Sequence, residues 1–257
     1  MIKSKTNPYI EKGICGFQEV IMYSLELICQ ESKEKLFNQF LGCKESFTPQ
    51  KEPTIYVVAG GPGSGKTSFR RESFENNKFN EKMHLHEPDE VMLAIPEYQD
   101  YIKNAEGNNI EILQIAREKW SDPALILANQ MLEEAANSRM DIIYERTCAM
   151  NQSYDFLENA KKSGYRIVFY AFYTDIKTAL NRTHERAIKE HRTLPDEITI
   201  TRTKIFAELF PKYIELSDEI YLFKSEDNKF REVLDYSEFY DLINFQFKQQ
   251  KQQYDFA

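Results

Sequence analysis

"VVAGGPGSGKTSFR", residues 57–70, is the stretch that decides how the rest of the chain is interpreted. It passes from an apolar run into a cluster of glycines and ends in a lysine and a threonine. The spacing Gly60-x-x-x-x-Gly65-Lys66-Thr67 is that of a loop that wraps the phosphates of a nucleotide. Glycines let backbone N–H groups turn inward around phosphate oxygens, and the N-terminus of a following helix adds a favourable dipole. The spacing therefore predicts a nucleoside triphosphate site.

The residues on both sides of the loop predict the strand and the helix that such a loop needs. The apolar run at 54–59 indicates a buried parallel strand, and residues 66–75 indicate the start of a helix. Further strands are predicted at 83–86, 141–147, 166–173 and 219–223, the last of them closing the sheet. Helices are predicted at 14–44, 109–120, 121–137, 151–163, 175–190, 196–216 and 237–248.

This alternation of strands and helices predicts an α/β fold of the P-loop kinase type. We expect a three-layer sandwich with a mostly parallel sheet and helices on both faces. The chain is predicted to be a single domain over 1–257, with a helical N-terminal leader at 14–44, a core at 54–223 and a C-terminal helix and tail at 237–257.

Composition excludes several classes of function. The 257-residue chain has a net charge of −8 and a pI near 5.3, which argues against a nucleic-acid partner because non-specific affinity for nucleic acid comes from Lys and Arg on phosphates. It contains no apolar run of 18 residues, so no membrane-spanning helix is expected. Its four cysteines form no C-x-x-C pair, which is typical of reduced thiols in a cytosol-like compartment.

The loop residues themselves predict how the nucleotide is bound. Lys66 should reach the β- and γ-phosphates, and the hydroxyl of Thr67 should hold Mg²⁺. An N-K-x-D guanine reader is missing from the sequence, which favours ATP and weakens a GTPase-type switch. The residues expected to bind the nucleotide are Gly61, Pro62, Gly63, Ser64, Gly65, Lys66, Thr67 and Ser68.

Polar residues at the ends of two predicted strands are candidates for chemistry. Asp89 follows the strand at 83–86, at the carboxyl edge where open α/β sheets bind ligands. It is either a catalytic carboxylate or an N-cap of the next helix, and position alone does not separate the two. Glu145 and Thr147 end the strand at 141–147, where they either face the ligand crevice or mark a strand end turning polar at the surface.

A basic stretch, "NRTHERAIKEHRTLPDEITITR" at 181–202, offers cations for a phosphate. Arg182, Arg186 and Lys189 recur at three to four residues and so share a helix face. The interleaved glutamates suit a salt-bridged surface helix equally well, so this pattern alone leaves both interpretations open.

Taken together, these segments resemble the zeta toxin family of P-loop kinases. The resemblance covers roughly residues 14 to 223 and consists of ordered motifs: a helical leader, "GGPGSGKTSFR", the acidic "HEPDEVM", the strand end "IIYERT", and an arginine helix with "RAIKEHRTLP" and "ITITR". The loop is generic to many nucleotide-binding proteins. The combination of the segments is specific.

The resemblance implies an ATP-dependent kinase that phosphorylates a hydroxyl of a nucleotide sugar, typically UDP-N-acetylglucosamine. It implies that Asp89 is the catalytic base, that Arg186 and Arg192 clamp the transferring phosphate, and that Glu145 and Thr147 contact the substrate. It also implies a small helical inhibitor protein, antitoxin-like, as a partner. The expected location is the cytoplasm, of the protein's own cell or of a target cell into which it is delivered.

Three departures from the family pattern put the acceptor in question. Glu87 stands where the family often has aspartate, Arg146 replaces a small residue, and Lys189-Glu190 replaces glycines. A different acceptor, such as a dinucleotide or a nucleic-acid end, therefore stays open. So does an ATP-binding regulatory protein without transfer activity.

Overall fold

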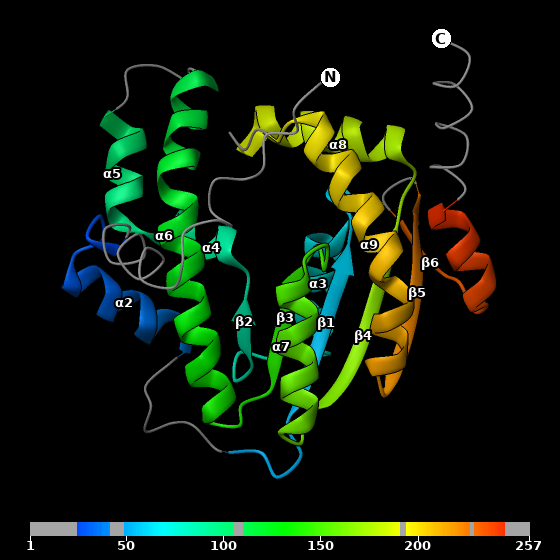
Figure 1. The fold of residues 1–257 in the computed structure, drawn as a ribbon. Coiled ribbons are helices and arrows are strands. Elements are labelled where there is room, and N and C mark those ends of the chain that lie inside the picture. Colours follow the sequence, from blue (N-terminus) through cyan, green and yellow to red (C-terminus); the bar gives the residue numbers. More distant parts are fainter. Residues whose placement is uncertain (1–24, 42–48, 105–109, 191–193, 227–228, 245–257) are drawn as a thin grey trace, which may run out of the picture. The chain divides into compact units, whose positions relative to one another are not determined.

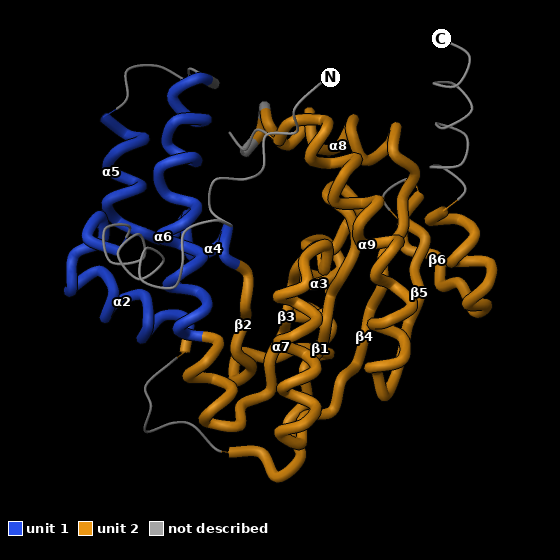
Figure 2. The backbone as a smooth tube through the Cα atoms, in the orientation of Figure 1, with its two compact units in different colours: residues 1–40, 88–131 blue, residues 41–87, 132–257 orange. Residues whose placement is uncertain are grey.

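The computed structural model describes residues 25–41, 49–104, 110–190, 194–226 and 229–244. They belong to two compact units (Figure 2). Unit 1 contains the residues up to 40 together with 88–131, and unit 2 contains residues 41–87 together with 132 onward. The expectation of a single domain stays a prediction.

Unit 2 is built on a six-stranded sheet with the order β2-β3-β1-β4-β5-β6 (Figure 1). The strands from β2 to β5 run parallel, and β6 pairs with β5 in the antiparallel sense. The mostly parallel sheet predicted from the sequence is confirmed. The strands are β1 (Thr54–Gly60), β2 (His84–His86), β3 (Ile142–Arg146), β4 (Arg166–Tyr173), β5 (Glu219–Glu226) and β6 (Lys229–Glu232).

The strand before the glycine loop lies in the middle of this sheet. In β1, Ile55 is opposite Ile142 of β3 on one side and Ile167 of β4 on the other. The neighbouring side chains of Val57 and Val58, which point to opposite faces, are both 0% exposed. A run of apolar β-branched residues is stable here because both faces of the strand are covered.

Helices cover both faces of the sheet, as the sequence predicts. On one face, Phe69 of α3 (Lys66–Glu75) packs against Tyr170 with ring centroids 5.2 Å apart. On the other, Phe169 stacks on Tyr213 of α9 (Asp196–Leu216) at 5.3 Å, and α7 (Asn151–Lys162) lies beside α9 (Figure 1). Phe169 and Tyr170 are adjacent in β4, so one strand serves both layers.

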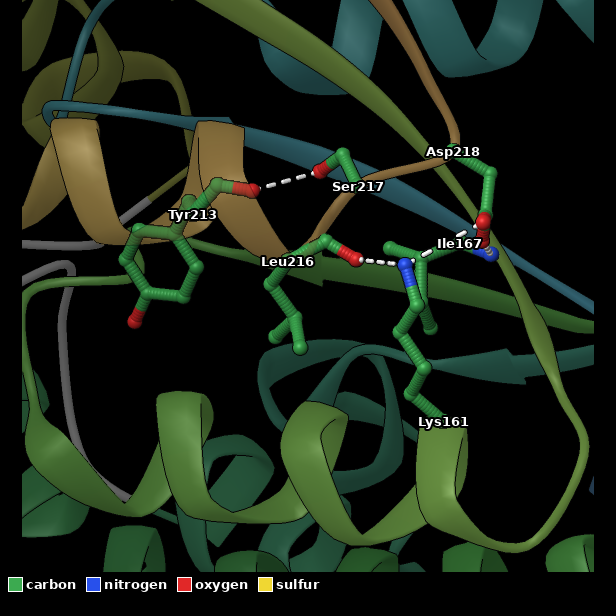
Figure 3. A network of polar contacts seen from close by, with 6 residues as sticks. All are labelled: Lys161, Ile167, Tyr213, Leu216, Ser217 and Asp218. Carbon is green, nitrogen blue, oxygen red and sulfur yellow. Dashed lines mark hydrogen bonds and ion pairs between the residues drawn. The ribbon is translucent and has the colours of Figure 1, made fainter.

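A polar network ties the helices of the second face to the amino end of β4 (Figure 3). Lys161, in the last turn of α7, donates to the carbonyl oxygen of Leu216 at 2.5 Å and to Asp218 Oδ1 at 3.1 Å. The other carboxylate oxygen of Asp218 accepts a 2.8 Å bond from the Ile167 amide. Because β1 and β4 are parallel, this network lies at the amino ends of the strands, and the glycine loop lies at their carboxyl ends.

Unit 1 is helical in its described part. It contains α2 (Gln30–Leu41) up to residue 40, α4 (Pro88–Ala94), α5 (Pro96–Asn104) and the first part of α6 (Ile110–Asn137). Tyr98 of α5 meets Trp120 of α6 edge to face, with centroids 6.4 Å apart. Of the predicted leader at 14–44, residues 14–24 and 42–44 lie outside the described residues, and α2 confirms a helix in the remainder.

The prediction of separate helices at 109–120 and 121–137 is wrong, because α6 is one continuous helix with Pro123 inside it. Proline at an internal position removes a helical hydrogen bond and costs roughly 3 kcal/mol. Trp120, Ala124 and Leu127 are 3%, 1% and 0% exposed. Burial of this apolar stripe on both sides of Pro123 outweighs the lost bond.

The expectation that the strand at 219–223 is the last one is also wrong. β5 extends to Glu226, and β6 follows as an antiparallel edge strand. The sequence of β6, "KFRE", is too short and too charged to show a strand pattern. Phe230 anchors it, with its ring 6.0 Å from Phe69 and 5.4 Å from Phe172.

Most of the remaining predicted helices are confirmed. The helix α8 (Ile176–Glu190) and α9 match their predicted ranges closely, and α7 ends before Gly164, which has φ 84°. Residues 236–244 are helical, and the rest of the predicted C-terminal helix lies outside the described residues. None of the helices that the structure describes has the length and apolar character needed to cross a membrane.

Phe69 of α3 offers a test of the core of unit 2, because its ring contacts rings from two strands of the sheet and from the loop after the helix. We expect Phe69→Ala to lower the free energy of unfolding by about 3–5 kcal/mol, as cavities in aromatic cores do. Urea denaturation measures this loss. Phe69→Leu keeps much of the apolar volume and should lose clearly less, and an equal loss in both variants would contradict the packing role.

Candidate functional site

The glycine loop connects the carboxyl end of β1 to α3, and close packing requires its glycines. Gly63 and Gly65 have φ of 74° and 95°, in the left-handed region that favours glycine. A Cβ on Gly61 would lie 2.3 Å from Thr203 Oγ1 of α9, and one on Gly63 would lie 2.6 Å from the Ala179 carbonyl oxygen of α8. The loop is thus pressed against two helices, and larger residues would displace it.

Ser64 indicates that the loop is shaped for a polar ligand. Ser64 is 2% exposed, and its hydroxyl has no hydrogen-bond partner among the described residues. A buried polar group without a partner is rare in folded proteins, since it loses its bonds to water without replacement. Together with the left-handed glycines and the following helix N-terminus, it fits a cradle for a phosphate.

Lys66 points back into the loop. Its ammonium donates bonds of 2.9 Å to the carbonyl oxygens of Gly60 and Gly61. Removal of the ammonium from water lowers the pKa of Lys66 to about 8; the nearby Glu145 carboxylate works against this shift, and the Arg186 guanidinium adds to it. A lysine desolvated between carbonyls and a second cation is prepared to accept an anion.

Glu145 joins the end of β3 to the first turns of α3. It is 5% exposed, and its Oε1 accepts a 2.6 Å bond from the Thr67 hydroxyl. Its Oε2 accepts a 2.5 Å bond from Arg70 Nε, and this ion pair is buried on both sides. A buried ion pair is stable only where both charges are also hydrogen-bonded. Because Arg70 holds one oxygen of the carboxylate, the other oxygen is fixed in place and orients the Thr67 hydroxyl.

The surroundings of Thr67 fit a magnesium ion. The hydroxyl gives its proton to Glu145, which leaves the lone pairs of its oxygen for a cation. Within the part of the chain that the structure describes, no three Asp, Glu, His or Cys side chains gather as a metal cage. Thr67 would therefore hold Mg²⁺ together with substrate phosphates and water, which is the usual coordination of this ion.

Helix α8 contributes two of the arginines. Arg182 Nη1 donates to the carbonyl oxygen of Gly63 at 3.1 Å and to Ser225 Oγ at 2.9 Å. Arg186, one turn further on, is close enough to Lys66 to lower the pKa of its ammonium. Arg192 lies outside the described residues.

Asp89 belongs to unit 1 and is the second residue of α4, three residues after the end of β2. It therefore lies in the first turn of the helix and not at the cap position. Its negative charge interacts favourably with the positive end of the helix dipole. Arg117 of α6 lies 3.6 Å from its Oδ1. This pair keeps a cation beside the carboxylate.

The other predicted site residues occupy ordinary positions. Thr147 is half-buried directly after β3, and Ser68 is exposed on α3. Pro62 lies in the loop turn. The structure thus brings together the loop residues, Glu145 and Arg186 within unit 2.

A family model described as zeta toxin matches residues 38–226, well over half of the chain. The chain belongs to the zeta toxin family. A comparison with curated protein sequences gives no match.

Solved structures show the same fold at low sequence identity. The chain is similar to a structure of the PezAT chromosomal toxin–antitoxin system of Streptococcus pneumoniae, with 14% identity over 84% of this chain and 87% of that one, at a TM-score of 0.60. It is also similar to AvrRxo1-ORF1:-ORF2 with ATP, with 13% identity over 79% of this chain and 65% of that one, at a TM-score of 0.58.

Sequence reasoning missed two partners in this zeta toxin family member. Arg70 is the buried partner of Glu145, and Thr203 packs on Gly61. The spacing of Arg70 from Thr67, three residues along a helix, was a usable signal, because it places both on one face. No local signal points to Thr203, which lies far along the chain from the loop.

The lowered pKa of Lys66 predicts a pH dependence of ATP binding. The charged ammonium binds phosphate, and phosphate in turn raises its pKa, so binding above pH 8 must take up a proton. We expect the Kd for ATP to rise roughly tenfold from pH 7.5 to pH 9, because one pH unit past the pKa removes most of the charge. Isothermal titration calorimetry measures it. Lys66→Arg, which stays charged, should show a flat profile, and a flat wild-type profile would contradict the assignment.

The buried pair of Glu145 and Arg70 predicts that the effects of substituting the two residues on the free energy of unfolding are strongly non-additive. Glu145→Leu should lower the free energy of unfolding by about 3–5 kcal/mol, because it leaves the Arg70 charge buried without its carboxylate. The double variant Glu145→Leu/Arg70→Met should be more stable than the single one, yet need more Mg²⁺ for ATP binding because Thr67 loses its acceptor. Denaturation and Mg²⁺ titration measure the two effects. Additive losses of stability would argue against the pair.

Proposed function

We propose that this protein is a kinase that transfers the γ-phosphoryl group of ATP to a hydroxyl of a nucleotide-type acceptor, with UDP-N-acetylglucosamine as the first acceptor to test. Family membership supports the coarser class, an ATP-dependent kinase. One observation carries the proposal. At the carboxyl end of the parallel strands, Lys66 is held by the Gly60 carbonyl and Thr67 by the Glu145 carboxylate.

In the proposed reaction, the chain supplies positioning and charge. Lys66 binds the β- and γ-phosphates, the loop amides surround them, and Arg186 with Arg192 stabilises the charge on the transferring group. Cations in this role are worth about 10³–10⁵ in rate. Magnesium, when bound with ATP, neutralises charge on the same phosphates.

For Glu145 we propose a positioning role. Both of its carboxylate oxygens are bonded by residues of α3, so it acts on the reaction by holding Thr67. The substrate contact expected at the end of β3 stays a prediction for Glu145. We propose Thr147, the half-buried residue that follows the strand, as the more direct contact with the substrate.

The acceptor hydroxyl must lose a proton as its oxygen forms the new bond to phosphorus while the bond to the ADP oxygen breaks. We propose Asp89 as the base that takes this proton. The loose transition state of phosphoryl transfer asks for positioning more than for strong basicity, so an ordinary carboxylate suffices. Arg117 beside Asp89 would hold the carboxylate in place.

Asp89→Asn tests the base. We expect kcat to fall at least 10²–10⁴-fold, the usual share of a general base, while the Kd for ATP changes little. Asp100→Asn, an exposed acid on α5 in the same unit, is the matched control and should keep full turnover. Retained turnover in Asp89→Asn would remove Asp89 from the mechanism.

The acceptor is identified by transfer from γ-labelled ATP to a panel of nucleotide sugars, dinucleotides, nucleosides and short oligonucleotides. A labelled product that disappears in Lys66→Ala establishes a kinase and names its acceptor. Tight ATP binding with no product across the panel would favour a regulatory protein without transfer activity.

An antitoxin-like partner, a small helical protein, belongs to the same proposal. The pneumococcal structure to which this chain is similar comes from a toxin–antitoxin system. Inhibition of transfer by such a protein is the property to measure once the acceptor is known.

A further inference from the structure

The carbonyl group of Gly63 is held from outside the loop by Arg182. The guanidinium donates from one nitrogen, Nη1, to this carbonyl at 3.1 Å and to the hydroxyl of Ser225 at 2.9 Å. Arg182 comes from α8 and Ser225 from the end of β5, so a single side chain links the loop, a helix and a strand. None of the roles proposed above uses this residue.

The orientation of this peptide matters for phosphate binding. In a planar trans peptide the carbonyl and the next N–H point in opposite directions. With the Gly63 carbonyl bound by Arg182, the Ser64 N–H on the other side of the same peptide donates to the Gly61 carbonyl at 3.3 Å and closes a turn of the glycine loop. Glycine at φ 74° gives little resistance to rotation of this peptide, so the restraint comes from its hydrogen bonds, that of the N–H to Gly61 and that of the carbonyl to Arg182.

The second anchor makes the restraint rigid. Ser225 is 2% exposed, and its own carbonyl accepts a 3.1 Å bond from Thr174 Oγ1. Arg182 is therefore fixed to the buried end of β5 and does not simply follow the loop. The backbone of Ala179, one turn earlier in α8, would be 2.6 Å from a Cβ on Gly63, so the same helix face closes on the loop.

We propose that Arg182 is a positioning residue for nucleotide binding: it locks the Gly63–Ser64 peptide in the orientation that shapes the phosphate loop and sets the register of α8 that brings Arg186 near Lys66. The inference rests on the proposed nucleotide site. It assigns to Arg182 no contact with the substrate. The alternative is a purely structural role, in which Arg182 only stabilises the fold, and the experiment must distinguish the two roles.

The chain provides a matched control for that alternative. Lys161 is also a cation that bridges a main-chain carbonyl and a side chain, those of Leu216 and Asp218, but it lies at the opposite edge of the sheet. Arg182→Met and Lys161→Met each remove one charge and one such bridge. They differ in whether the bridge holds the loop.

The experiment is calorimetric titration of the full chain with ATP and Mg²⁺, together with thermal melting of each variant. We expect the Kd for ATP to rise roughly ten- to a hundredfold in Arg182→Met, the range for loss of a charged hydrogen bond, and to stay within twofold of wild type in Lys161→Met. Ser225→Ala leaves the carbonyl contact but frees the guanidinium, so it should give a smaller rise. This variant also tests the proposal if Arg182→Met fails to fold.

Chemical rescue separates positioning from fold stability. Guanidinium ion at low millimolar concentration can occupy the space left in Arg182→Ala and donate to the Gly63 carbonyl, so it should restore part of the ATP affinity. Methylammonium, which lacks the planar fork of donors, should restore less. Guanidinium does not stabilise proteins in general, so restored binding without a raised melting temperature supports positioning.

The outcomes are distinguishable from failure of the proposed function. A wild-type chain that does not bind ATP overturns the nucleotide site and this inference with it. A wild-type chain that binds ATP, with Arg182→Met binding equally well, overturns this inference alone. Equal losses in Arg182→Met and Lys161→Met, or no rescue by guanidinium, would also overturn it.

Discussion

The buried carboxylate of Glu145 is the constraint on which the site depends. A charge that is 5% exposed must be compensated within the protein, and the compensation comes from Arg70 and Thr67 on a single helix face. Strand β3 and helix α3 are therefore fixed to each other. Removing any one of these three side chains would leave a charge or a hydroxyl without its partner.

Close packing adds a second constraint around the loop. Its glycines are in contact with α8 and α9, and β6 brings Phe230 within 2.9 Å of where a Cβ on Gly65 would lie. The phosphate cradle is thus enclosed by elements from the second half of the chain. A loop of this kind owes its shape to its neighbours as much as to its own sequence.

The sequence predicted the fold where patterns are local. The apolar run of β1, the glycine spacing and the helical periods of α8 and α9 each lie within one segment, and the structure confirms them. The division of the helices between residues 120 and 121 was wrong, and β6 was missed, because tertiary burial decided both: the core around Trp120 keeps α6 continuous, and Phe230 holds a strand of only four residues.

The candidate site divides in the same way. Lys66 and Thr67 follow from spacing alone, whereas the roles of Arg70 and Arg182 depend on partners distant in the sequence, Glu145 and Gly63. A lone charge pattern on α8 suits a solvated helix face as well as a phosphate clamp. The contacts of Arg182 with the Gly63 carbonyl and of Arg186 with the charge of Lys66 show that this face lies against the loop and is not simply a solvated face.

The central position of β1 also has a consequence for the synthesis of the protein. Its Ile55 pairs with Ile142 and Ile167, both encoded far downstream, so its two hydrogen-bonded edges stay open while the first half of the chain emerges from the ribosome. Pairing between segments so distant in sequence is slow, because loop closure has to precede it. The nucleotide loop is therefore synthesised early, and the strands and helices that hold it are synthesised late. The loop can reach its native shape only after most of the chain has been made.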